Sequence, residues 1–141
     1  MSPEKTKQLQ EAFPEYFKCL DEKPRRTGLY FGIENSDGWY DLIYKLCEDI
    51  KKIDPKDFYW VQIKEKFGLG RFYASGGNKE TYDLIDKAER KSAFICEDCG
   101  QDGCTRHRNG WLRTLCDQCA ESRSGEGATY IKLETNEEDD D

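Results

Sequence analysis

The sequence predicts an α+β fold in which helices pack on a small antiparallel β-hairpin and a cysteine-rich element follows. Two runs of β-branched and aromatic residues lie between segments whose apolar residues have helical spacing. Five of the seven cysteines then fall between residues 96 and 119. We therefore expect an α+β core over residues 1–92, a cysteine-rich element over 93–123 and a tail over 124–141.

The predicted core begins with a helix over residues 4–20, interrupted at Pro14 because proline lacks the amide hydrogen that a helix needs. A clearer helix runs from about residue 37 to 53, where the pair Asp54-Pro55 ends it. A third helix spans about residues 79–92 after a glycine-containing turn. The second helix turns one apolar stripe inward, which contains Trp39, Leu42, Ile43, Leu46, Ile50 and Ile53.

The predicted hairpin consists of the runs 58–63 and 69–74, which are rich in residues typical of strands. Side chains alternate between the two faces of a strand. Strict alternation turns Val61, Ile63 and Phe67 toward the core. The same alternation places on the opposite, polar face Trp60, Gln62, Lys64 and Lys66.

The polar face of this hairpin is the first candidate binding surface. Clustered lysine and arginine side chains beside a tyrosine could hold a phosphate-bearing ligand, or they could provide specificity for a protein partner. Glu65 falls on the apolar side, where it either reaches water or pairs with a cation such as Arg71. The candidate binding residues on the polar face are Gln62, Lys64, Lys66, Arg71 and Tyr73.

Charge is distributed unevenly along the chain. Residues 124–141 contain seven acidic residues and one basic residue, so nearly all of the net charge of −7 lies there. We expect a solvated, disordered tail, because like charges repel one another and bury no apolar surface. No segment approaches the roughly 20 consecutive apolar residues of a membrane span, and the N-terminus lacks the apolar stretch of a secretion signal. The expected location is the cytoplasm.

The cysteine-rich element has the spacing of a metal site. The pairs Cys96-x2-Cys99 and Cys116-x2-Cys119 are separated by sixteen residues, a spacing at which two such pairs close a tetrahedral four-cysteine zinc site. Four thiolates leave no open coordination position, so the sequence predicts one structural Zn²⁺ per chain in a zinc-ribbon-like or knuckle element. Iron in the same set of thiolates is an alternative.

Other residues of this element leave two questions open. Cys104 and His107 lie between the cysteine pairs, and either could replace a ligand. Arg106 and Arg113 lie near Trp111, a combination suited to phosphate contact and base stacking, so they are candidate nucleic-acid-binding residues. Against this interpretation, residues 93–123 are not net basic, and a zinc ion held by four thiolates has a net negative charge.

Three segments, taken together, resemble a family of small zinc-binding proteins encoded by bacteriophages and prophages. The resemblance covers residues 30 to 120 in order, and Cys119 replaces a histidine that family members often carry as the last ligand. It implies a phage origin, a zinc-containing fold and the host cytoplasm, without a known activity. The matching motifs are Phe31-Gly32-Ile33-Glu34 with Asp37-Gly38-Trp39-Tyr40-Asp41-Leu42-Ile43 and Leu46-Cys47, Gln62-x-Lys64-Glu65-Lys66-Phe67-Gly68 with Arg71-Phe72-Tyr73, and Cys96-Glu97-x-Cys99-Gly100 with Trp111-Leu112-x-Thr114-Leu115-Cys116-Asp117.

Several functions are compatible with these features. The first is a viral accessory protein that binds and inhibits a host component, most naturally a host protein of a defence system. The second is a nucleic-acid-binding zinc-ribbon protein, and the third is a protein that sequesters a nucleotide or another small ligand. An enzyme is disfavoured, because the sequence presents no nucleophile, base or open metal position of the kind that catalysis requires.

Overall fold

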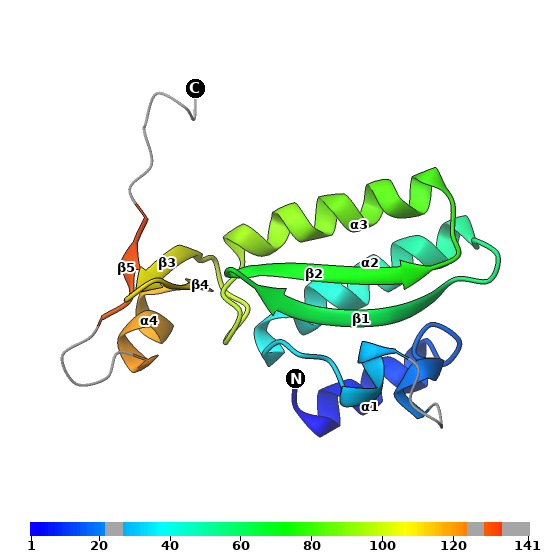
Figure 1. Ribbon diagram of the computed structural model, residues 1–141, viewed down its shortest axis with the longest axis horizontal. Coiled ribbons are helices and arrows are strands. Elements are labelled where there is room, and N and C mark those ends of the chain that lie inside the picture. The colour runs from blue at the N-terminus through cyan, green and yellow to red at the C-terminus, as the bar shows by residue number, and fades with distance from the viewer. Residues whose placement is uncertain (22–26, 124–128, 134–141) are drawn as a thin grey trace.

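The computed structural model describes residues 1–21, 27–123 and 129–133. Within them, four α-helices accompany two small antiparallel sheets, which confirms the α+β class (Figure 1). The sheets have the strand orders β1-β2 and β4-β3-β5. The helices are α1 (Pro3–Ala12), α2 (Tyr40–Ile53), α3 (Lys79–Lys91) and α4 (Asp117–Arg123), and the strands are β1 (Tyr59–Lys66), β2 (Leu69–Ser75), β3 (Cys104–Arg108), β4 (Trp111–Leu115) and β5 (Ile131–Lys132). Short 3-10 helices are η1 (Lys18–Asp21), η2 (Gly28–Phe31), η3 (Asp37–Trp39) and η4 (Ser92–Phe94).

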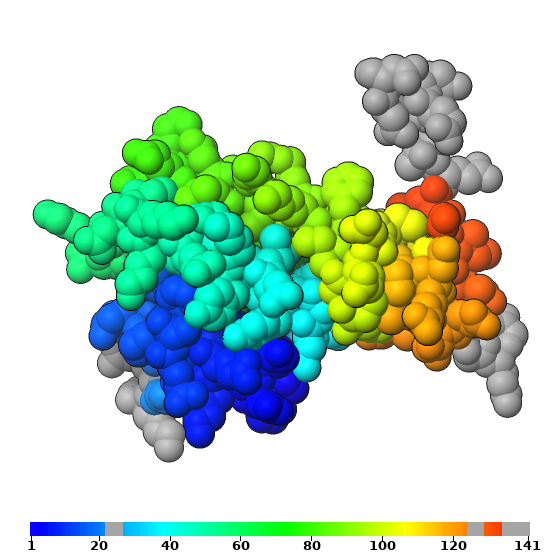
Figure 2. Space-filling model, turned by 180° about the vertical axis from the view of Figure 1, so that it is seen from behind, coloured from blue at the N-terminus to red at the C-terminus, as the bar shows by residue number. Residues whose placement is uncertain are grey.

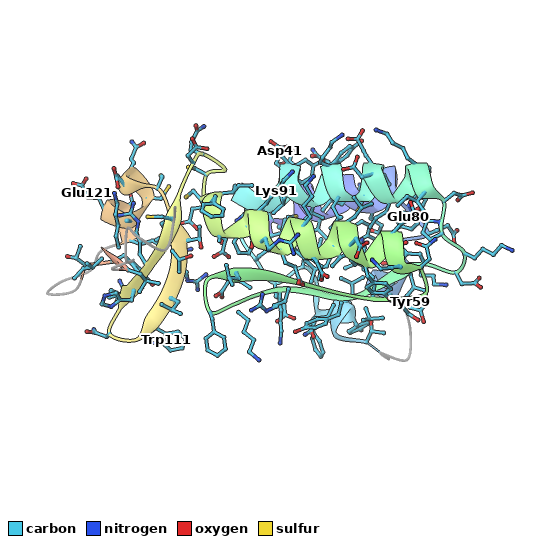
Figure 3. All side chains as sticks on the ribbon, turned by 90° about the horizontal axis from the view of Figure 1, so that it is seen from above. Asp41, Tyr59, Glu80, Lys91, Trp111 and Glu121 are labelled. Carbon is cyan, nitrogen blue, oxygen red and sulfur yellow. The ribbon has the colours of Figure 1, made fainter. Side chains whose placement is uncertain are left out.

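The larger part of the molecule, which we call the body, is built on the β1–β2 hairpin. Helices α2 and α3 lie side by side on one face of this hairpin, and the other face points away from them (Figures 1 and 3). Helix α2 turns the predicted apolar stripe inward, and Asp54 ends it in a left-handed conformation with φ of +53°. Buried residues of the stripe are Trp39, Ile43, Leu46 and Ile50.

A β-bulge changes which residues of β1 face the core. The pairing with β2 shifts between Trp60 and Gln62, so one extra residue enters β1 and the alternation changes phase. Trp60 is therefore fully buried beside Ile63 and Phe72, and its predicted place on the polar face is wrong. Phe67, predicted as a core residue, is 65% exposed because it occupies the turn, with φ of +56°.

Both edges of the hairpin are already hydrogen bonded. On the β2 edge, one side chain of α3 and one of η4 accept backbone N–H groups: Glu89 accepts from Phe72 (2.9 Å), and Ser92 Oγ accepts from Gly70 (2.8 Å). On the β1 edge, the backbone of Glu34 bonds to the strand on both sides of Lys64. Further strands are therefore not needed to satisfy this sheet, and its face away from α2 and α3 is covered only in part, where Gly28 of η2 lies against the Gln62 side chain.

The smaller part of the molecule is built on the β3–β4 hairpin, with α4 packed beside it (Figure 1). Its boundary lies beyond the predicted residue 123, because β5 pairs with β3 and Tyr130 is buried against Leu115 and Ala120. Residues 129–133 therefore belong to this part, and we call residues 93–123 with 129–133 the C-terminal element. The acidic run of the predicted tail, 134–141, lies outside the described residues.

Candidate functional site

Four cysteine side chains converge in the C-terminal element. The Sγ atoms of Cys96, Cys99, Cys116 and Cys119 all lie within 4.8 Å of one another, and those of Cys99 and Cys116 are 3.6 Å apart. Sulfurs at the corners of a tetrahedron, each about 2.3 Å from one ion, would be about 3.8 Å from one another. The four predicted ligands therefore form a cluster that is compatible with one bound metal ion.

The two cysteine pairs reach this cluster along different backbone paths. Residues 96–100 form a tight turn in which Gly100, with φ of +85°, donates its N–H to Cys96 O (2.9 Å). In the second pair, Cys116 follows β4 and Cys119 lies in the first turn of α4. The backbone N–H of Cys119 donates to Cys116 Sγ (3.3 Å) and lowers the pKa of the Cys116 thiol to about 7. This hydrogen bond favours the thiolate, which is the form that binds a metal.

Neither alternative ligand joins the cluster. In the β3–β4 ladder Cys104 pairs with Leu115, and His107 pairs with Leu112. The group of side chains that could hold a metal within the described part of the chain contains neither of them. The outer four cysteines are therefore the ligand set that the geometry supports.

A buried carboxylate inside the first cysteine pair joins the C-terminal element to the body. Glu97 is only 1% exposed, and its carboxylate accepts from Arg113 Nη1 (2.9 Å) and from the backbone N–H of Ser36 (3.0 Å). Its carbonyl accepts from the N–H of Gly38 (2.7 Å). Arg113 also lies 3.7 Å from Glu65 on β1. These contacts compensate the charge of Glu97 and connect the cysteine cluster to the hairpin of the body.

The body meets the first cysteine turn through the Asp37-Gly38-Trp39 segment. A Cβ at Gly38 would lie 2.3 Å from Cys96 O, so only glycine permits this approach. Trp39 Nε1 donates to Ile95 O (2.8 Å) directly before the turn. Figure 2 shows this contact from behind, where cyan residues of the body touch yellow residues of the C-terminal element.

The arginines predicted to bind nucleic acid are held by internal acceptors. Arg106 is buried, and its guanidinium donates to Leu115 O (3.0 Å) and to an Asp117 carboxylate oxygen (2.6 Å). Arg113 is bound to Glu97, as described above. A phosphate could reach either guanidinium only by displacing these acceptors. The structure therefore keeps Arg106 apart from the hairpin residues, and it brings Arg113 to the same hollow as Lys66 with its guanidinium already bound by carboxylates.

The five candidate residues of the hairpin do lie on one face, which we call the basic face. Across the strands Gln62 pairs with Tyr73 and Lys64 with Arg71, and Lys66 follows two residues after Lys64. Within the described ranges, none of the three cations has a carboxylate oxygen within 4.0 Å. Glu65, on the opposite side of β1, pairs with Arg113 and not with Arg71.

Comparison with known proteins adds no assignment. No protein-family model, curated protein or solved structure matches the chain. In the described residues, every helix is too short or too polar to cross a membrane. The functional conclusion therefore depends on the cysteine cluster and the basic face.

Sequence reasoning missed the residues that join the two parts of the molecule. Glu97 carried a usable signal, because a carboxylate between two metal-binding cysteines adds charge to an already anionic site and requires a cation nearby.

The β3–β4 hairpin was also missed, although Asn109-Gly110 is a typical two-residue turn and predicts it. Both residues have positive φ values, +50° and +87°, as such a turn requires.

Proposed function

We propose that the cysteine cluster binds one structural zinc ion per chain. Four thiolates match the tetrahedral preference of zinc and fill every coordination position, which leaves none for a substrate. The C-terminal element has a small core of its own, formed around Leu115, Ala120 and Tyr130. A metal would therefore supply much of its stability. The first pair resembles a zinc-ribbon turn, whereas the second pair begins a helix.

The identity of the metal is tested by native mass spectrometry of freshly purified protein. The expected mass exceeds that of the denatured chain by one zinc ion. If the protein instead contains one iron ion and shows the visible absorption of iron bound to thiolates, the resident metal is iron and not zinc. A native mass equal to that of the bare chain would contradict a resident metal.

On this scaffold the basic face captures the partner. We assign the chain the role of a phage-encoded accessory protein that binds and inhibits a host protein, as an anti-defence inhibitor would. The phage origin comes from the resemblance described above. The observation that carries the binding role is that Lys64, Lys66 and Arg71 lie on one face and form no ion pair among the described residues, although the charge of Arg71 acts on Glu89 at longer range. Cations that form no ion pair and lie on one small surface favour an anionic partner.

The test is capture of host proteins by the tagged full chain, with quantification of each captured protein. The double variant Lys64→Glu with Arg71→Glu should lose the partner that the wild-type protein enriches. Lys7→Glu with Lys87→Glu changes the net charge equally at two exposed positions on α1 and α3 and should keep it. Equal capture by both double variants would contradict the proposed role of the basic face.

A small anionic ligand is a second candidate for the same face. A hollow between η2 and the hairpin is lined by Gly28, Gln62, Lys64 and Tyr73, together with Thr27 and Val61. A cation beside a tyrosine ring and an amide is a suitable combination for a nucleotide. A rise in melting temperature with one nucleotide of a panel, lost in Lys64→Glu, would support this candidate.

A further inference from the structure

The tips of the two hairpins form a second surface feature outside the cysteine cluster and the basic face. Phe67 occupies the β1–β2 turn and Trp111 begins β4 directly after the β3–β4 turn; their side chains are 65% and 73% exposed. Figure 3 shows Trp111 extending from its hairpin into open space. Between the tips lies a hollow of ≈ 460 Å³, which we call the tip cleft. Its lining consists of Glu65, Lys66, Phe67, Asn109, Gly110, Trp111, Leu112 and Arg113.

The two tips are held together by contacts between the hairpins. Thr114 Oγ1 donates to Gly68 O (2.6 Å), and the Gly68 N–H donates to the Glu65 carboxylate (2.7 Å). A Cβ on Gly68 would lie 3.3 Å from the backbone nitrogen of Arg113, so the turn packs closely on β4. Arg113 then connects β4 to Glu65. The cleft is therefore formed before any ligand binds, which lowers the entropy cost of binding.

The three tryptophans of the chain differ in a way that points to a binding role for the tip cleft. The indole N–H of Trp39 donates to Ile95 O, and that of Trp60 donates to Cys47 Sγ (3.4 Å). Both of these side chains are fully buried. Trp111 is the exposed one, and its indole N–H donates to no group of the described residues. Exposed tryptophan with a free donor is typical of side chains that dominate protein interfaces.

Charge near the tip cleft selects the kind of occupant. Within the cleft, the Arg113 guanidinium is shared by two carboxylates, Glu97 at 2.9 Å and Glu65 at 3.7 Å, so this side of the cleft does not attract a further negative charge. The cations that form no ion pair lie on one side only, at Lys66, whose ammonium is 5.5 Å from the Phe67 ring centroid, and farther along the basic face at Lys64 and Arg71. An occupant must therefore place an apolar group between the aromatic tips and its negative charge toward β1.

We propose that the tip cleft binds an apolar side chain of an acidic polypeptide segment whose carboxylates lie along the basic face. This inference rests on the proposed function and names the chemistry of the partner. A single-stranded nucleic acid fits less well, because each stacked base brings its own phosphate. On the Trp111 side, the guanidiniums of Arg106 and Arg113 are already bound to internal carboxylates. A polypeptide can place an apolar side chain in the tip cleft and its carboxylates at other positions, along the basic face.

The test uses short synthetic peptides that carry one leucine or phenylalanine beside a run of aspartate and glutamate, with binding to the full chain followed by fluorescence anisotropy. Binding should weaken about tenfold or more when the apolar residue of the peptide becomes alanine, or when Trp111→Ala or Phe67→Asn is made in the chain. Asparagine tolerates the positive φ at position 67. Phe94→Ala, which removes an exposed aromatic side chain outside the cleft, should leave binding unchanged.

Each other outcome overturns the inference. It fails if acidic peptides do not bind, if Trp111→Ala and Phe67→Asn bind as wild type does, or if oligothymidylate binds more tightly than every peptide. Metal content and melting temperature of each variant show that the chain is folded. If the host partner is lost with Lys64→Glu and Arg71→Glu but is kept by Trp111→Ala and Phe67→Asn, the proposed function stands and the tip cleft alone is wrong.

Discussion

The two hairpins of this molecule carry similar sets of cations and use them differently. On β3 and β4, each arginine has an acceptor within its own element: Arg106 binds Asp117, Arg113 binds Glu97, and Arg108 donates to Arg123 O (2.7 Å). On β1 and β2, no ion pair joins Lys64, Lys66 or Arg71 to a described residue; Arg71 has only a long hydrogen bond to Gly70 O (3.3 Å) and a longer-range interaction with Glu89. A cation that is bound internally stabilises the fold, whereas a cation without a partner is available to a ligand.

This difference has a physical cause in the size of the two parts. The body buries Trp39, Trp60, Phe17 and their neighbours, and its ion pairs on α2 and α3 lie at solvent-accessible positions, where they contribute little to stability. The C-terminal element has only a few buried apolar residues and depends on its cysteines and its arginine contacts. The hairpin cations of the C-terminal element are therefore structural, whereas those of the body's hairpin are available for recognition.

The largest effect is expected when one ligand of the cysteine cluster is removed. Cys99→Ser should abolish metal binding, because an incomplete set of thiolates cannot close a tetrahedral site. The C-terminal element should then be cut readily by protease, while a fragment that contains residues 1–92 resists. Metal content and the size of the protected fragment measure this. A variant that keeps one metal ion per chain and resists protease throughout would show that Cys99 is not a ligand.

The contact between the two parts predicts the next largest effect. Gly38→Ala should reduce the free energy of unfolding by about 3 kcal/mol, because the added Cβ would lie 2.3 Å from a backbone oxygen. Gly28→Ala is the matched control, since the three atoms nearest to its Cβ would all belong to the movable side chain of Gln62. Urea unfolding of both variants tests this contact. An equal decrease in the free energy of unfolding in both variants would mean that the body and the C-terminal element are not coupled through Gly38.

The reactivity of cysteine thiols should also differ between the body and the C-terminal element. Burial raises the pKa of the Cys47 thiol in the body to about 12, so at pH 8 only about one molecule in ten thousand carries a thiolate there. Iodoacetamide should leave Cys47 unlabelled in the folded protein, and labelling should increase as the pH rises toward 12. Chelation of the metal should expose Cys99 and Cys116 to labelling at pH 8. Mass spectrometry of the digested protein measures the extent of labelling at each cysteine. Labelling of Cys47 at pH 8 in the folded protein would contradict its burial in the core.

Features that depend on local chemistry could be predicted from the sequence, and features that depend on distant contacts could not. The cysteine spacing predicted the cluster, and apolar spacing predicted the buried stripe of α2. The bulge after Trp60 was missed because alternation along one strand contains no information about the register of its partner. The pairing of Glu65 with Arg113 was missed because 48 positions of sequence separate them and only the folded chain brings them together.

The most direct test compares one arginine from each hairpin. Arg113→Met keeps an apolar stem but leaves the buried carboxylate of Glu97 without its cation, and should cost about 3 to 5 kcal/mol in the free energy of unfolding. Arg71→Met removes a cation without an ion pair to any described residue and should change the free energy by about 0.5 kcal/mol or less. Urea unfolding of the two variants side by side is the decisive measurement. Equal losses of stability would contradict the division between structural and available cations.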